Sequence, residues 1–152
     1  MLRFILGLMV VWTVSGCTDS LLSRSDEAAP VWASKVSFEK EGRRYFTGKH
    51  EGAYHLEWGK NEARLAALRQ VAVELELELT DPLVMVRLAD EKDEYAGIKM
   101  LDASGEPVLI HHFREDEEYH ERWRRKGKKL HDVYVLVSFP VEALEEARKG
   151  GM

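Results

Sequence analysis

The lone cysteine of this chain, Cys17, is the feature that most constrains what the chain can fold into. Because the 152 residues contain no second cysteine, no disulfide can form within the chain, and packing alone must hold the fold together. Apolar residues make up 45% of the sequence and charged residues 32%, a balance typical of a globular domain with a real core. A chain of this length suits one domain.

Cys17 follows an N-terminal segment that has the composition of a signal peptide. A short basic start, residues 1–3, leads into an apolar run over residues 4–14. This run is shorter than the roughly 20 apolar residues that a membrane span needs, but it fits the hydrophobic region of a signal peptide. We therefore expect residues 1–16 to direct export and to be removed.

The residues just before Cys17 resemble the lipobox of bacterial lipoproteins. Val14 is followed by two small residues, Ser15 and Gly16, which would let the backbone fit the signal peptidase. The cysteine sulfur is the nucleophile that accepts the diacylglyceryl group. We therefore expect cleavage before Cys17 and a lipid on that residue; the alternatives are an ordinary signal peptide and an uncleaved anchor.

A lipid on Cys17 would hold the protein on a membrane surface. Each buried CH₂ group contributes about 0.8 kcal/mol, so one acyl chain anchors weakly and two or more anchor firmly. The residue after the cysteine is Thr18 and not an aspartate. By resemblance to enteric lipoproteins, this favours sorting of the protein to the outer membrane. Residues 17–29 are expected to form the lipidated cysteine and a flexible tether, reaching on the order of 20 Å. The predicted location is the periplasmic face of the outer membrane.

Residues 30–152 carry the pattern of a single folded domain. Its most regular element is a predicted helix over residues 61–79, or from Leu56, because alanine, leucine and valine recur there at three- and four-residue steps. The small residues of this apolar stripe would let the helix lie close against a sheet.

Strands are expected on both sides of this helix. Their predicted positions are residues 32–38 and 43–47 around a turn at Glu41-Gly42, residues 98–101 and 107–113 around Ser104-Gly105, and residues 133–139. Gly48 and Gly52 are expected to break the second strand, and residues 83–88 fit either a strand or a helix. The last strand is continuously apolar and should be central, with a short helix after Pro140. The predicted fold class is α+β, a mostly antiparallel sheet with one long helix packed on a face and a short C-terminal helix.

Several motifs recur in a fixed order behind the lipobox. They are Pro30-Val31-Trp32, Tyr45-Phe46-Thr47-Gly48, the alanine-rich helix through Ala63, Ala66, Ala67, Val71 and Leu75, and the strand Val133-Tyr134-Val135-Leu136-Val137 before Pro140, Leu144 and Ala147. In this order the chain resembles the membrane-associated twenty-kilodalton lipoprotein family (Lpp-type, FlgP-like) over most of residues 30–149. The resemblance implies a small α+β envelope domain without known catalysis, with surface or assembly roles, and it carries over no active-site residues.

A cationic run near the end of the chain is the candidate patch for an anionic partner. Six of the eight residues 122–129 are basic, namely Arg122, Arg124, Arg125, Lys126, Lys128 and Lys129; the other two are Trp123 and Gly127. Such a run suits anionic headgroups, lipopolysaccharide or an acidic protein, with Trp123 at the interface. The favoured alternative is a solvated hairpin tip, neutralised by the acidic residues upstream, Glu115, Asp116, Glu117, Glu118 and Glu121. Nucleic acid is not expected as a partner, because the formal net charge is −5 and export is predicted.

The sequence predicts no catalytic, metal or cofactor site. Adjacent His111 and His112 would point to opposite faces of a strand, and the loop serine Ser104 fits a turn. The expected function is therefore a noncatalytic assembly or interaction module with an envelope protein as partner. The alternative is a periplasmic binder of a small amphiphile or glycan. Its pocket would lie between the helix and the sheet and be lined by Trp32, Tyr45, Phe46 and Trp58.

Overall fold

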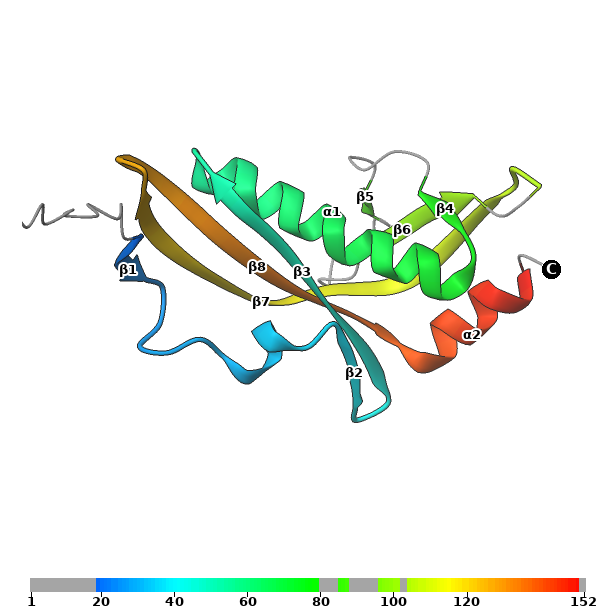
Figure 1. Ribbon diagram of the computed structural model, residues 1–152. Helices are drawn as coiled ribbons and strands as arrows, with labels where there is room; N and C mark the ends of the chain where they lie inside the picture. The colour runs from blue at the N-terminus through cyan, green and yellow to red at the C-terminus, as the bar shows by residue number, and fades with distance from the viewer. Residues whose placement is uncertain (1–18, 80–84, 88–95, 102–103, 151–152) are drawn as a thin grey trace, which may run out of the picture.

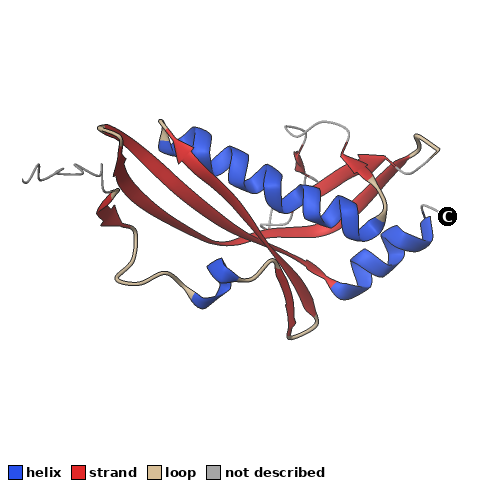
Figure 2. Cartoon of the chain, viewed as in Figure 1, coloured by secondary structure: helices blue, strands red, loops and turns tan. Residues whose placement is uncertain are grey.

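The computed structural model describes residues 19–79, 85–87, 96–101 and 104–150. It shows an antiparallel sheet with a long helix on one face and a short helix at the C-terminus (Figures 1 and 2), which confirms the predicted α+β class. In chain order the elements are β1 (Ser20–Arg24), a short 3-10 helix η1 (Val31–Ser34), β2 (Ser37–Lys40), β3 (Arg43–Ala53), α1 (Leu56–Leu75), β4 (Glu78–Leu79), β5 (Met85–Arg87), β6 (Ala96–Leu101), β7 (Pro107–Arg125), β8 (Lys128–Pro140) and α2 (Val141–Gly150).

The strand order is β2-β3-β8-β7-β6-β4, and every pair of neighbours is antiparallel. The long strand β7 connects the two ends of the sheet. Its first part pairs with β6, and its remainder pairs with β8. Near the change of partner stands His112, whose φ of 62° departs from extended backbone. Two short strands lie off this path, since β5 pairs with β6 and β1 pairs with the far end of β7.

Strand β8 lies between β3 and β7, so the predicted central position of residues 133–139 is confirmed. Both faces of the strand are covered, which explains its continuous apolar run. Val133, Val135, Val137 and Phe139 belong to the main core beneath α1. Leu136, on the opposite face, packs with Trp32 and Tyr119 in a second, smaller cluster. We call the sheet face opposite α1 the outer face.

The small residues of α1 bring the helix close to the sheet, as expected. Ala63 and Ala67 are fully buried against it. The expectation that Gly48 and Gly52 would break the second strand is wrong, because β3 continues to Ala53. Gly48 sits inside the strand, where the absence of a side chain makes room for the helix backbone. At Gly52 the φ of 78° accompanies a shift in the pairing register with β8.

Two further boundaries differ from the prediction. The long helix begins at Leu56 and ends at Leu75, not at residue 79, because Glu76 adopts a left-handed conformation with φ 57° and the amide of Leu77 caps the carbonyl of Ala72 at 2.9 Å. The expected stop at Asp81-Pro82 lies outside the described residues. Residues 32–38 are not one strand either.

The first part of that segment forms the turn η1, which places Trp32 on the outer face before β2 begins at Ser37. The amide of Ala33 donates to the carbonyl of Pro30 at 3.0 Å, and the hydroxyl of Ser34 donates to the carbonyl of Val31 at 2.8 Å. The turn therefore satisfies its own backbone while its tryptophan is buried.

Candidate functional sites

The residues of the predicted lipidation motif, Val14, Ser15, Gly16 and Cys17, lie outside the described residues. The segment that follows them is partly folded, which corrects the expectation of a flexible tether over residues 17–29. Residues 20–24 form β1, and its register pairs Ser20 with Arg124 and Arg24 with Glu121. The chain thus enters the fold at the end of the β7–β8 hairpin, where Figure 1 shows β1 beside the end of β7.

A nearly buried carboxylate, Glu121, holds β1 in place. It accepts hydrogen bonds from the Tyr119 hydroxyl at 2.7 Å and from the Trp123 indole nitrogen at 3.0 Å, and it forms an ion pair with Arg24 of β1 at 3.2 Å. Burial and the bond to Glu121 raise the pKa of Tyr119 to about 12. The Tyr119 hydroxyl therefore remains a donor to Glu121 at neutral pH.

A second charged cluster lies on the same hairpin, closer to its turn. The guanidinium of Arg125 forms a two-pronged pair with the buried carboxylate of Asp132 and also lies 3.6 Å from the carboxylate of Asp19. The other hydrogen bond to Asp132 comes from the amide of Gly52 at 2.9 Å. The hydrogen bond to Asp132 raises the pKa of Arg125, so the guanidinium keeps its charge. This pair joins β3, β7 and β8 at one point, beside Asp19, the residue before β1.

The predicted cationic run forms the tip of the β7–β8 hairpin, and we call residues 122–129 the tip hairpin. Two of its residues face inward, since Arg125 binds Asp132 and the Trp123 indole binds Glu121. Lys128 donates to the Tyr54 hydroxyl at 3.0 Å. Within the described part of the chain, no carboxylate lies within ion-pair distance of the remaining four cations: Arg122, Arg124, Lys126 and Lys129.

Most of the upstream acidic residues do not neutralise the tip hairpin, contrary to the favoured alternative. Because β7 is long, Glu115 and Glu118 point to α1 instead. Glu115 pairs with Arg64 at 2.5 Å, and Glu118 pairs with Lys60 at 2.8 Å. The hydrogen bond that Arg64 donates to Glu115 raises the pKa of Arg64. Although burial opposes its charge, the hydrogen bond from Lys60 lowers the pKa of Glu118. Of the acidic set, Glu121 alone reaches the tip hairpin, through Trp123.

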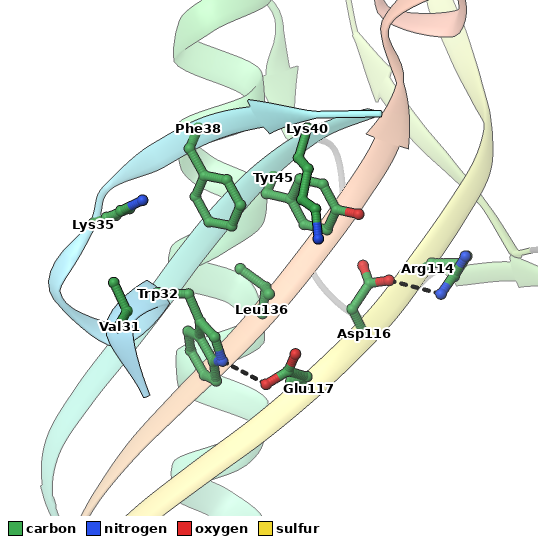
Figure 3. Close-up of a pocket in the computed structure, with 10 residues that line it drawn as sticks. All are labelled: Val31, Trp32, Lys35, Phe38, Lys40, Tyr45, Arg114, Asp116, Glu117 and Leu136. Carbon is green, nitrogen blue, oxygen red and sulfur yellow. Dashed lines mark hydrogen bonds and ion pairs between the residues drawn. The ribbon is translucent and has the colours of Figure 1, made fainter. Parts of the chain in front are cut away.

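A cavity of about 410 Å³ opens on the outer face (Figure 3). Three aromatic side chains line it, those of Trp32, Phe38 and Tyr45. The rings of Phe38 and Tyr45 stack in parallel with their centroids 4.8 Å apart. The Trp32 indole donates to Glu117 at 2.6 Å. Its other lining residues are Val31, Lys35, Lys40, Arg114, Asp116 and Leu136. Aromatic faces bordered by charges of both signs can stack on a ring and hydrogen bond its polar groups.

The predicted aromatic pocket between the helix and the sheet is therefore wrong in its position and in two of its residues. Trp32 and Tyr45 line the cavity on the outer face, away from α1. Phe46 is buried in the main core beneath the helix. Trp58 is half exposed on the first turn of α1, where its ring meets His50 edge to face. Alternation along β3 separates Tyr45 from Phe46, because successive residues of a strand point to opposite faces.

The described residues contain no cluster of three or more histidine, cysteine, aspartate or glutamate side chains arranged to hold a metal ion. Neither helix in the described ranges is long and apolar enough to cross a membrane. The structure thus presents two surface features with chemical character, the tip hairpin and the outer-face cavity. No family model, no curated protein and no solved structure matches this chain.

Proposed function

We propose that this protein is a bacterial lipoprotein, cleaved before Cys17 and held by acyl chains on the periplasmic face of the outer membrane, where its domain is a noncatalytic interaction module. The observation that carries the proposal is the lipobox, Val14 to Cys17, behind a basic start and a short apolar run. The order of motifs through residues 30–149 supports membership of the membrane-associated twenty-kilodalton lipoprotein family.

The roles of the charged residues support a binding function over catalysis. Glu115 and Glu118 join the sheet to α1, and Asp132 joins three strands through Arg125. These carboxylates thus have structural partners that account for their positions. An envelope protein is the proposed partner, and the membrane is contacted through the acyl chains on Cys17.

Substitutions at two glycines test the processing step. Gly16→Leu places a bulky side chain where the peptidase needs a small one, whereas Gly7→Leu makes the same change inside the apolar run. We expect the Gly7 variant to be cut and lipidated like the wild type. The Gly16 variant should keep its leader, as mass spectrometry of the N-terminal peptide would show. An unmodified Cys17 in the wild-type protein would reject the proposal.

Crosslinking in intact cells tests the interaction role. The wild-type protein and the Cys17→Ser variant are compared at equal abundance, and crosslinked envelope proteins are identified by mass spectrometry. We expect at least one partner that is crosslinked only when the protein is anchored. If no envelope protein is enriched over the unanchored variant, the module has no such partner.

The outer-face cavity supports a second candidate function, the binding of a small amphiphile or glycan. Its stacked Phe38 and Tyr45 rings offer a face to a sugar, and Lys35, Lys40 and Arg114 offer hydrogen-bond donors. A ligand at one hundred times its dissociation constant would stabilise the fold by about 2.7 kcal/mol. A thermal-shift screen with glycans and lipids, repeated on Tyr45→Ala, should reveal a shift that the variant loses. No shift with any compound would remove this candidate.

A further inference from the structure

The end of the molecule where the chain enters the fold lies beside the tip hairpin. The carboxylate of Asp19 is 3.6 Å from the guanidinium of Arg125, and Ser20 pairs with Arg124 in the β1–β7 ladder. Cys17 precedes Asp19 by two residues in the sequence, and two residues of chain span at most about 7 Å. A lipid attached to Cys17 would therefore enter the bilayer next to the tip hairpin.

We propose that the tip hairpin lies in the headgroup layer of the membrane that holds the lipid, where its cations bind anionic phospholipid headgroups. This inference rests on the proposed lipidation of Cys17. It fixes the orientation of the domain, with the β7–β8 turn toward the membrane and α2 away from it. Figure 1 shows these two parts at opposite ends of the sheet.

The cations of the tip hairpin are arranged in a way that favours an anionic surface. Arg124 stands directly opposite Lys129 in the ladder, and Arg125 stands opposite Lys128. Like charges in such positions destabilise a sheet, and bound anions would relieve the repulsion. The turn between them, Lys126-Gly127, has two left-handed residues, with φ values of 48° and 77°. This tight turn projects the cations from the end of the sheet.

The acidic residues at this end are engaged with other cations. Asp19 and Asp132 pair with Arg125, Glu121 pairs with Arg24, and Glu51 pairs with Lys49 at 2.7 Å. Among the residues that the structure describes, Arg122, Arg124, Lys126 and Lys129 have no acidic partner. They form a local positive surface on a chain whose formal net charge is −5. Each lysine or arginine near an anionic membrane strengthens binding about fivefold.

Exposed apolar and aromatic side chains gather at the same end. Tyr54 follows the end of β3 and is 58% exposed, and Trp58 on the first turn of α1 is 50% exposed. Leu21 and Leu22 of β1 are 36% and 39% exposed. Lys128 connects the tip hairpin to this group, since its ammonium lies 5.6 Å from the centre of the Tyr54 ring. Tyrosine and tryptophan beside basic residues are typical of the interface between water and a bilayer.

Lysine labelling of the lipidated protein tests the orientation. The protein is reconstituted into vesicles of phosphatidylcholine alone, or of phosphatidylcholine with phosphatidylglycerol, and treated with a membrane-impermeant acylating reagent. Mass spectrometry then gives the labelling rate of each lysine, and the mass of the Cys17 peptide in the same digest reports the lipid. Lys99 and Lys149, which lie on β6 and α2, are internal controls.

We expect Lys126, Lys128 and Lys129 to be labelled at least about fivefold more slowly in the anionic vesicles than in the neutral ones, since each cation of the tip hairpin contributes about that factor to binding. High salt should remove this protection, while both control lysines should react alike in all vesicles. With Cys17 lipidated, equal rates at the tip hairpin in both vesicles would overturn the inference and leave the lipoprotein proposal intact. An unmodified Cys17 peptide would overturn both. Protection seen in cells but not in protein-free vesicles would assign the tip to a protein partner and reject the lipid contact.

A pair of charge-reversal variants separates the local effect from net charge. Lys126→Glu with Lys129→Glu and Arg69→Glu with Lys149→Glu change the net charge equally. We expect the first pair to abolish the protection of Lys128 in anionic vesicles and the second to preserve it. The same loss of protection in both would show that only the overall charge matters, which would contradict the proposal.

Discussion

Ala63 of α1 crosses β3 directly over Gly48, so closely that a Cβ atom placed on Gly48 would lie 1.7 Å from the carbonyl oxygen of Ala63. It would also lie 2.6 Å from the amide nitrogen of Ala67. Both contacts are with helix backbone, which cannot rotate away as a side chain can. The helix must therefore move off the sheet if residue 48 gains any side chain.

Gly48→Ala should consequently lower the free energy of unfolding by about 3 kcal/mol, the upper part of the range for overpacked cores. Urea denaturation followed by circular dichroism measures this change. Gly105→Ala is the control, because Gly105 has a positive φ of 84° but open space around its Cβ position. It should cost about 1 kcal/mol through backbone strain alone. Equal losses in the two variants would show that the close approach of α1 is not what Gly48 provides.

The sequence predicts this packing in part. The alanine periodicity of α1 indicates a helix lying close to a sheet, and the continuous apolar run of β8 indicates a strand covered on both faces; both are correct. The end of α1 is less predictable, because Leu79 follows Leu75 at a four-residue step and so continues the apolar spacing of the helix. The left-handed residue that ends the helix is Glu76, where glycine would have been a recognisable stop.

Strand β1 could not be predicted from its own residues. Ser20–Arg24 has two apolar side chains and all its positions are exposed, so no periodicity marks it. Its position depends on partners about one hundred residues away, Glu121 and Arg125. Part of this arrangement can nevertheless be predicted from the sequence, because a tight turn fixes which residues of β7 and β8 stand opposite each other. A two-residue turn at Lys126-Gly127 pairs Arg125 with Lys128 and brings Glu121 opposite Asp132, which places Asp132 on the same short ladder.

Removal of the Glu121 carboxylate should release β1 and destabilise the fold. In Glu121→Ala the nearly buried Tyr119 hydroxyl loses its acceptor, and Arg24 and Trp123 lose theirs as well. We expect a loss of about 2 kcal/mol in unfolding free energy. Amide exchange in residues 20–24 should also become much faster.

Glu121→Gln keeps an acceptor oxygen and should lose less than half as much. Glu145→Ala, an exposed change on α2, should stay within about 0.5 kcal/mol of the wild type. If Glu121→Ala leaves the exchange of residues 20–24 unchanged, then backbone pairing alone holds β1.

The two tryptophans that the sequence assigned to one pocket should respond differently to truncation. Trp32 is buried on the outer face and donates to Glu117, so Trp32→Ala should lower the unfolding free energy by about 3 kcal/mol. Trp58→Ala removes a half-exposed ring and should lower it by less than about 1 kcal/mol. Urea titrations of both variants measure the difference. Similar losses would place both rings in one core and contradict the fold described here.

His131 should give the protein a dependence of stability on pH in the mildly acidic range. It stands opposite Arg122 in the β7–β8 ladder, with the ring of His120 centred 6.3 Å away. Burial, and then the charges of Arg122 and His120, lower the pKa of His131. Near pH 6.5 and below, the unfolded chain therefore binds a proton that the folded chain refuses, and stability falls as the pH drops through this range.

His131→Gln removes the titrating ring and should flatten the stability profile between pH 7.5 and 5.5, values chosen about one unit on either side of the ordinary histidine pKa. Urea denaturation at several pH values in this range measures the slope. His111→Gln, an exposed change on the neighbouring strand β7, should leave the slope as it is in the wild type. Glu118 affects stability in a more acidic range. Its pKa is lowered, so its ion pair stabilises the fold at neutral pH, and this stabilisation is lost only as the pH falls through the lowered pKa. A slope that persists in His131→Gln between pH 7.5 and 5.5 would therefore assign the dependence to another histidine.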